Sequence, residues 1–107
     1  MNTQFKKGVL EMMVLLAIES TDKYGYELVN EISEIVDVNE GTIYPILKRL
    51  NVDLYLETYL QESNEGPPRK YYHLTLKGKT YLQELCADWQ EFSGNVNKYL
   101  KKERKNT

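Results

Sequence analysis

The residues best suited to chemistry lie in the stretch 39–50. If this stretch is a helix, successive residues are about 100° apart, and Tyr44 and Lys48 then lie on its outward face. Hydroxyl groups and cations in such an arrangement can meet phosphate oxygens or base edges of DNA. The expected chemistry is recognition of a partner. The residues on or beside this face are Gly41, Thr42, Tyr44, Pro45, Lys48 and Arg49.

Groups for catalysis or metal binding are sparse. The chain has one cysteine, Cys86, and one histidine, His73, so neither an internal disulfide nor a zinc site of the usual ligand count is available. There is no Ser-His-Asp set and no glycine-rich nucleotide motif. We therefore expect no enzyme activity, no metal and no cofactor. The lone cysteine favours a reducing cytoplasm.

The overall charge argues against nucleic-acid binding at first sight. The net charge is −2 and the isoelectric point is about 5.5, whereas a basic surface is the usual signature of a DNA-binding protein. The charges are unevenly placed, however. Acidic residues gather in the first third of the chain, and basic residues gather in the middle and at the end. This uneven distribution is compatible with a locally basic face on an acidic protein.

The patterning indicates three helices before residue 51. The first, about Gln4 to Ser20, is apolar on nearly every side, which is typical of a central, buried helix; its apolar run is too short to span a membrane. The second, about Tyr24 to Ile35, is amphipathic. The third starts at Asn39, a good N-cap residue, and we expect a bend at Pro45.

A hairpin and a long helix complete the chain. Alternating residues 54–61, a turn at 63–68 and a return strand at 69–76 predict two antiparallel strands. Thr75 can cap a fourth helix that runs to about Lys102. The predicted fold class is mainly α with a two-stranded β-hairpin, in the order of a winged helix-turn-helix. Residues 1–76 would form this domain, and residues 77–107 a dimerisation helix with a basic tail.

The long helix carries an apolar seam close to a heptad repeat. The seam is long relative to the small body before it, so a partner must cover part of it, and a second copy of the chain is the simplest partner. The seam residues are Leu82, Leu85, Trp89, Phe92, Val96 and Tyr99.

Trp89 has two interpretations. It could anchor the dimer, as the seam suggests, or a pair of such rings could stack on a flat aromatic ligand. In the second case Phe92, Met12 and Met13, together with Val9, could complete the walls.

Three segments resemble the PadR family of bacterial transcriptional regulators. They are Tyr24-Gly25-Tyr26-Glu27-Leu28, the stretch from Gly41 to Leu50 (GTIYPILKRL), and the stretch from Arg69 to Thr75 (RKYYHLT) with Gly78. They occur in order and span nearly the whole chain. The short C-terminal part resembles members with a single dimerisation helix. The resemblance implies a homodimer that binds palindromic operators in double-stranded DNA and usually represses, with release by a ligand or stress signal.

Matched residue by residue, Thr42, Tyr44, Pro45 and Lys48 correspond to the family's major-groove face, and Arg69 and Lys70 to its basic wing tip. Asn39, Gly41 and Arg49 complete the predicted DNA-binding set. Tyr44 could instead pack partly against the second helix.

The chain departs from the family pattern in two places. A glycine usually follows the Arg-Leu pair, but here the sequence reads Asn51-Val52-Asp53-Leu54, and Asn51 is the candidate left-handed residue. The wing carries Pro67 and Pro68 where basic residues are common. The acidic composition and this wing favour a second hypothesis, a winged-helix protein–protein adaptor or anti-repressor that does not bind DNA.

Overall fold

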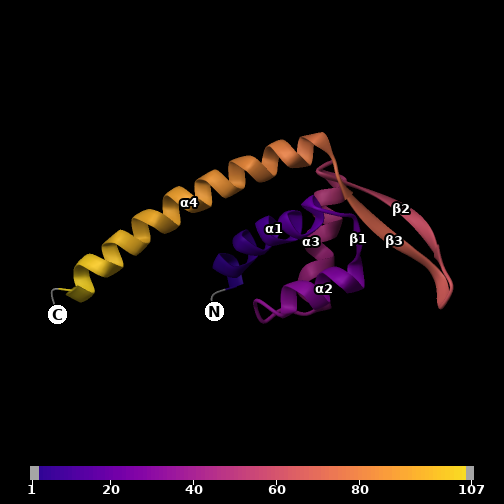
Figure 1. Ribbon diagram of the computed structural model, residues 1–107, viewed down its shortest axis with the longest axis horizontal. Coiled ribbons are helices and arrows are strands. Elements are labelled where there is room, and N and C mark those ends of the chain that lie inside the picture. Colours follow the sequence, from indigo (N-terminus) through magenta and orange to yellow (C-terminus); the bar gives the residue numbers. More distant parts are fainter. Residues whose placement is uncertain (1–2, 106–107) are drawn as a thin grey trace.

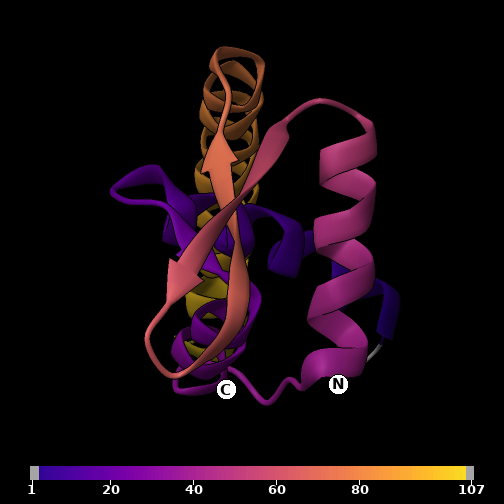
Figure 2. The same ribbon diagram turned by 90° about the vertical axis from the view of Figure 1, so that its right-hand side faces the viewer.

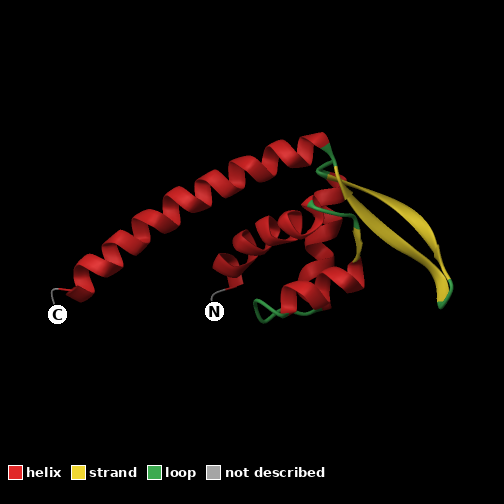
Figure 3. Ribbon diagram, viewed as in Figure 1, coloured by secondary structure: helices red, strands yellow, loops and turns green. Residues whose placement is uncertain are grey.

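The computed structural model describes residues 3–105, and the side chains of residues 8–102. Four helices and three strands follow one another along the chain (Figures 1 and 3). Their bounds are α1 Thr3–Glu19, β1 Lys23–Tyr24, α2 Gly25–Ser33, α3 Glu40–Val52, β2 Leu56–Ser63, β3 Gly66–Leu74 and α4 Leu76–Lys105. The mainly helical prediction is confirmed.

Helix α1 is the centre of the hydrophobic core. Val14 and Leu15 are fully buried, and α1 packs against α2, α3, α4 and β3. The inner stripes of the next two helices close over it, with Leu28 from α2 and Ile43 and Leu47 from α3. Each such side chain stabilises the fold by about 1.5–3 kcal/mol relative to an exposed one. The prediction of a buried first helix is confirmed. In the part of the chain that the structure describes, no helix is long and apolar enough to cross a membrane.

Helix α3 begins where predicted, but its cap differs in detail. Asn39 has extended backbone, and its carbonyl accepts the first helical bonds, from the amides of Thr42 and Ile43. Its side chain makes no bond to a helix amide; Oδ1 instead lies 3.5 Å from the Thr42 hydroxyl. The helix then runs without interruption through Pro45, as Figure 2 shows.

The end of α3 differs from the prediction. The helix continues past Asn51 to Val52, and the left-handed residue is Leu54, with φ 66°. The amide of Leu54 donates to the carbonyl of Asn51 (3.1 Å), and the amide of Tyr55 donates to that of Leu50 (3.0 Å). These two bonds form a Schellman motif, in which glycine usually takes the left-handed position. The expectation for Asn51 was therefore wrong by three residues.

The sheet has three strands instead of the predicted two, in the order β1-β3-β2. Only Lys23 and Tyr24 form β1, pairing with Tyr72 and Tyr71. Two adjacent β-type residues before a helix were too short a signal to predict. The turn is also shorter than predicted, because β3 already begins at Gly66 and contains both prolines. These lie beyond the stretch paired with β1, where a missing amide donor is tolerated.

Helix α4 starts at the predicted cap. The Thr75 hydroxyl oxygen accepts a bond from the Gly78 amide at 2.9 Å, and the same hydroxyl lies 2.8 Å from the carbonyl of Leu54, to which it donates. The first half of α4 lies along α1, and the rest extends past the body of the molecule (Figure 1). The seam therefore has two parts: Leu82 is buried in the core of this chain, whereas Phe92 and Tyr99 are exposed.

Candidate nucleic-acid interface

The outward face of α3 is the one predicted. Gly41, Tyr44, Pro45 and Lys48 are exposed, and Thr42 is half-buried beside them. The opposite stripe, Ile43, Ile46, Leu47 and Leu50, is buried. The hydrophobic core therefore fixes which side of α3 can meet a partner. Asn39 lies exposed at the start of this face.

Tyr44 packs partly against α2 and is partly exposed to solvent. Its ring lies against Gly25 at the start of α2, yet 39% of the residue remains exposed. Burial, followed by the nearby charge of Glu40, raises the pKa of Tyr44. The phenol is therefore neutral at physiological pH and can donate or accept a hydrogen bond. The partial packing against the second helix that the sequence allowed is present.

The prediction for Arg49 differs from what the structure shows. It was predicted to join the outward face, but its guanidinium forms an ion pair with Glu11 of α1. The other carboxylate oxygen of Glu11 accepts a bond from the Tyr81 hydroxyl of α4. A charge engaged in this way ties α3 to the rest of the chain. Sequence periodicity placed Arg49 on the flank of α3 but could not show a partner 38 residues away.

The wing cations Arg69 and Lys70 lie on β3, after the turn at the wing tip, and share a cavity with Tyr44 of α3. The tip is the turn after Ser63, with Glu65, and it carries no basic side chain among residues 63–66. Arg69 lies over the ring of Tyr24 at 4.6 Å, 3.8 Å from Glu65, and Lys70 lies over the ring of Tyr72 at 5.9 Å. The description of these two cations as the tip was therefore wrong, and they lie partway along β3.

One cavity lies between the wing and helix α3. Its volume is about 220 Å³, and Tyr44 contributes to its wall from α3. The remaining lining comes from the start of α2 and from β3: Tyr24, Gly25, Tyr26, Arg69, Lys70 and Tyr72. Burial, followed by the neighbouring Tyr44, raises the pKa of Tyr72. Tyr24 and Tyr26 were not predicted as lining residues, although they belong to the Tyr-Gly-Tyr motif.

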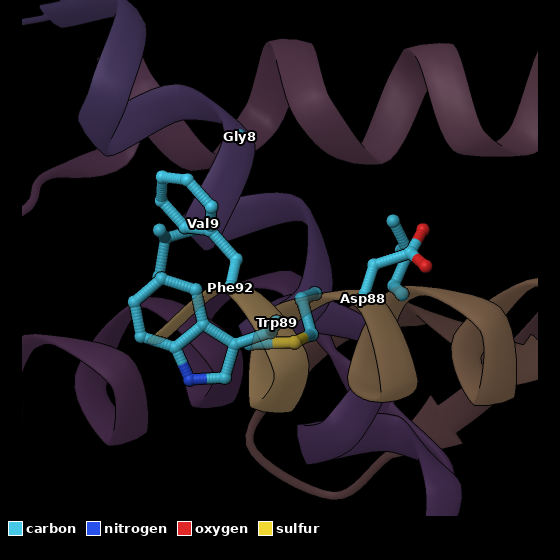
Figure 4. A pocket seen from close by; sticks show the side chains of 7 residues that line it. Gly8, Val9, Asp88, Trp89 and Phe92 are labelled. Atoms are coloured by element: carbon cyan, nitrogen blue, oxygen red, sulfur yellow. The ribbon is translucent and has the colours of Figure 1, made fainter. Parts of the chain in front are cut away.

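A second cavity, of about 280 Å³, lies between α1 and α4. Figure 4 shows the rings of Trp89 and Phe92 beside Val9. Met12 lines it as predicted, but Met13 does not, because it packs against the core. The lining residues that were not predicted are Gly8, Leu85 and Asp88.

The predicted dimer seam divides into a buried and an exposed part. Leu82 belongs to the core of this chain and is only 1% exposed, so its assignment to a dimer interface was wrong. Leu85 is half-buried against the same core. The exposed part lies farther along α4, at Trp89, Phe92, Val96, Tyr99 and Leu100. Lys98, Lys101 and Lys102 are exposed beyond it, and the side chains of the basic tail from residue 103 lie outside the described residues.

A polar network holds the base of the wing. Asp22 accepts a bond from the Tyr59 hydroxyl (2.6 Å) and lies 2.8 Å from Nδ1 of His73. Burial raises the pKa of Asp22, but the bonds from Tyr59 and His73 and the charge of His73 outweigh it, so the pKa is lowered overall. His73 thus has a structural role in this network. Among the residues that the structure describes, no group of three or more potential ligands could hold a metal ion.

Comparison with known proteins gives one consistent result. Residues 14–84 match the Transcriptional regulator PadR-like family. The crystal structure of a PadR-like transcriptional regulator from Bacillus cereus is 41% identical, covers 92% of this chain and 97% of that one, and has a TM-score of 0.83. A PadR family transcription regulator from Clostridium difficile is 31% identical, covers 84% and 96%, and has a TM-score of 0.77.

A protein from Lysinibacillus sphaericus described as "Uncharacterized protein X" is 34% identical over 98 residues, covering 88% of this chain and 90% of that protein. The matched range, residues 14–84, includes all three segments that resemble the family. The chain belongs to the PadR-like family of transcriptional regulators.

Proposed function

We propose that this protein is a dimeric, sequence-specific DNA-binding repressor that a small molecule or stress signal releases from its operator. The observation that carries the proposal is the cavity where Tyr44 of α3 and the wing cations Arg69 and Lys70 meet. Two cations of β3 and a phenol hydroxyl of α3 that face the same space suit a phosphate backbone, because each cation can neutralise one phosphate.

The arrangement suits the major groove. The groove is about 12 Å wide and admits one helix, and the exposed face of α3 offers Thr42, Tyr44 and Lys48 to base edges or phosphates. Lys70 and Arg69 would then reach the flanking backbone from β3. Since the net charge is −2, affinity would depend on these local contacts. Acting on DNA in a bacterial cell places the protein in the cytoplasm.

The exposed half of α4 supports a homodimer. Trp89, Phe92 and Tyr99 leave an apolar stripe without cover from their own chain, and a second copy offers a matching stripe. A two-fold dimer would present two α3 helices to the two halves of a palindromic operator.

The cavity between α1 and α4 supports a small-molecule signal. Its walls are mostly apolar, and Trp89 and Phe92 offer ring faces on which a flat aromatic compound could stack. Met12 adds a side chain that adapts to varied shapes. The same ring of Trp89 can serve both the dimer and the ligand, because the cavity opens beside the exposed stripe of α4.

Selection of bound duplexes from a random DNA library tests DNA binding directly. Enriched sites should be palindromic, and affinity should fall steeply between about 50 and 200 mM salt, because phosphate contacts release counterions. Lys48→Ala should weaken binding of the selected duplex by about tenfold. Lys79→Ala, an exposed lysine on α4, is the matched control and should leave affinity unchanged. No enrichment, or binding that salt does not affect, would overturn the proposal.

The release and repression steps need their own measurement. A reporter gene behind the selected operator should be transcribed less when the protein is present, and a panel of flat aromatic compounds that quench Trp89 fluorescence should restore it. Activation of the reporter would show that the protein is not a repressor.

The acidic composition and Glu65 at the wing tip support one alternative, an adaptor that grips another protein with the same fold. An adaptor would enrich no duplex, and Lys48→Ala would not change its partner's affinity in a salt-dependent way.

A further inference from the structure

One partly buried carboxylate joins three helices. Glu11 lies on α1, and its side chain is 15% exposed. One of its oxygens pairs with Arg49 of α3, and the other accepts a hydrogen bond from the Tyr81 hydroxyl of α4. A carboxylate between a cation and a hydroxyl donor has both oxygens satisfied, so this position is fixed.

Tyr81 is itself held in place. Its ring stacks on that of Tyr55 with centroids 4.2 Å apart and planes 13° from parallel. Tyr55 directly follows the left-handed residue that ends α3. Burial, followed by the bond to Glu11, raises the pKa of Tyr81, so the phenol keeps its proton. α4 is therefore linked to α3 at two points, through Glu11 and through Tyr55.

The same two helices form the second cavity. On α1, Glu11 lies between Val9 and Met12, which both line the cavity. On α4, Tyr81 lies four residues, about one helical turn, before the lining residue Leu85. A molecule between α1 and α4 acts on their spacing, and the Tyr81–Glu11 hydrogen bond spans that spacing one turn away.

We infer that Glu11 is a positioning residue that couples the occupancy of the α1–α4 cavity to the position of helix α3. An occupant that changes the spacing of α1 and α4 shifts the Tyr81–Glu11 bond, and Glu11 moves Arg49 and the adjacent Lys48 with it. This inference rests on the proposed function, because it requires DNA binding that the cavity controls.

A substitution that fills the cavity tests the coupling without a known effector. A Cβ at Gly8 meets no heavy atom within 4 Å, so Gly8→Leu places a side chain at the cavity wall, and Gly8→Ala is its control. Tyr81→Phe removes the hydrogen bond to Glu11 but keeps the ring stacked on Tyr55. Thr80→Val removes an exposed hydroxyl from the same helix, next to Tyr81, and is the second control.

The measurement is the Kd of the full-length dimer for its selected duplex, by fluorescence anisotropy. Gly8→Leu should weaken binding at least about fivefold relative to Gly8→Ala, a typical size for coupling between sites. In the Tyr81→Phe background the same change should be less than about twofold. In the Thr80→Val background it should remain fivefold.

Each other result has a definite meaning. An equal loss in both the Tyr81→Phe and Thr80→Val backgrounds, or no loss in either, overturns the inference while DNA binding stands. A wild-type protein that selects no duplex overturns the proposed function itself. If circular dichroism shows that Gly8→Leu does not fold, Val9→Phe fills the same cavity and the same comparison is made.

Discussion

Gly25, the first residue of α2, lies directly against the ring of Tyr44 on α3. A Cβ at position 25 would overlap Cε1 of the ring and would lie 3.1 Å from its hydroxyl oxygen. The absence of a side chain at Gly25 thus lets the two helices of the helix-turn-helix approach. It also sets the direction in which the phenol of Tyr44 faces the cavity next to Lys70.

We expect Gly25→Ala to impair DNA binding more than folding. Tyr44 is exposed enough for its ring to swing away from the new methyl group, so the free energy of unfolding should change by less than about 1 kcal/mol. The displaced phenol would weaken affinity for the selected duplex about fivefold, which corresponds to ~1 kcal/mol. Urea unfolding and anisotropy titration measure the two quantities. In a Tyr44→Ala background the substitution should no longer affect affinity; a persisting loss would contradict this account.

Gly78→Ala should have the opposite effect. Here a Cβ would overlap the backbone carbonyl of Tyr55 and lie 2.6 Å from Cδ1 of the buried Leu74, and neither atom can swing away. Overpacking of this kind should lower the free energy of unfolding by about 2–3 kcal/mol. Gly94→Ala on the same helix is the control, since its Cβ meets nothing within 4 Å. That control should stabilise by about 0.5–1 kcal/mol, because glycine is a poor helix former. Equal unfolding midpoints for the two variants would contradict the prediction.

Local patterns predicted most of the fold. The apolar stripe of α3 fixed its outward face, and Thr75 marked the start of α4, because capping and periodicity depend on residues a few positions apart. The strand β1 was missed because its pairing depends on β3, which lies far along the chain. Leu54 was missed because nothing in its residue type favours a left-handed conformation.

The site was predicted less completely than the fold. Tyr44 and Lys48 lie where the pattern placed them, but Arg49 and Leu82 do not have the surroundings that were expected. The sequence pattern around Arg49 and Leu82 is the same whether their side chains face solvent or contact a residue far along the chain. Periodicity alone therefore could not separate the two cases. Glu11 is such a residue, and it looked like an interruption in an apolar helix.

Leu54→Gly should stabilise the protein. Leu54 holds the left-handed position of the Schellman motif at φ 66°, which costs an L-residue with a side chain roughly 1–2 kcal/mol. The residue is 66% exposed, so little burial is lost. We expect a gain of about 1 kcal/mol after the extra entropy of glycine in the unfolded chain is deducted. Leu54→Ala keeps the Cβ and should give no gain in urea unfolding. A gain from alanine as large as that from glycine would show that the left-handed strain is not the cause.

The Asp22–Tyr59 bond should appear in an alkaline titration. The hydrogen bond to Asp22, followed by burial and the charges of Asp22 and Tyr71, raises the pKa of Tyr59 from near 10 to about 12. Because the folded-state pKa is the higher one, the bond stabilises the fold fully below pH 10 and this contribution is lost between about pH 10 and 12. Absorbance near 295 nm should show a late-ionising phenol that Tyr59→Phe removes. Asp22→Ala should shift that step toward pH 10, and an unshifted step would contradict the assignment.

Leu82 and Trp89 lie two turns apart on α4 but should respond differently to truncation. Leu82 is buried within its own chain, so Leu82→Ala should lower the free energy of unfolding by about 2–5 kcal/mol. Trp89 is 37% exposed at the start of the uncovered stripe, so Trp89→Ala should leave each chain folded but weaken dimerisation. A central interface tryptophan contributes about 2 kcal/mol or more, so the dimer Kd should rise at least about 30-fold. Sedimentation velocity over a concentration series measures the dimer, and circular dichroism at the same concentrations measures folding. Since dimerisation and stability are linked by mass action, both must be compared at matched concentration. If Trp89→Ala dimerises like the wild type, the prediction is contradicted. The stripe would then contact another partner, and the Trp89 ring would only line the cavity.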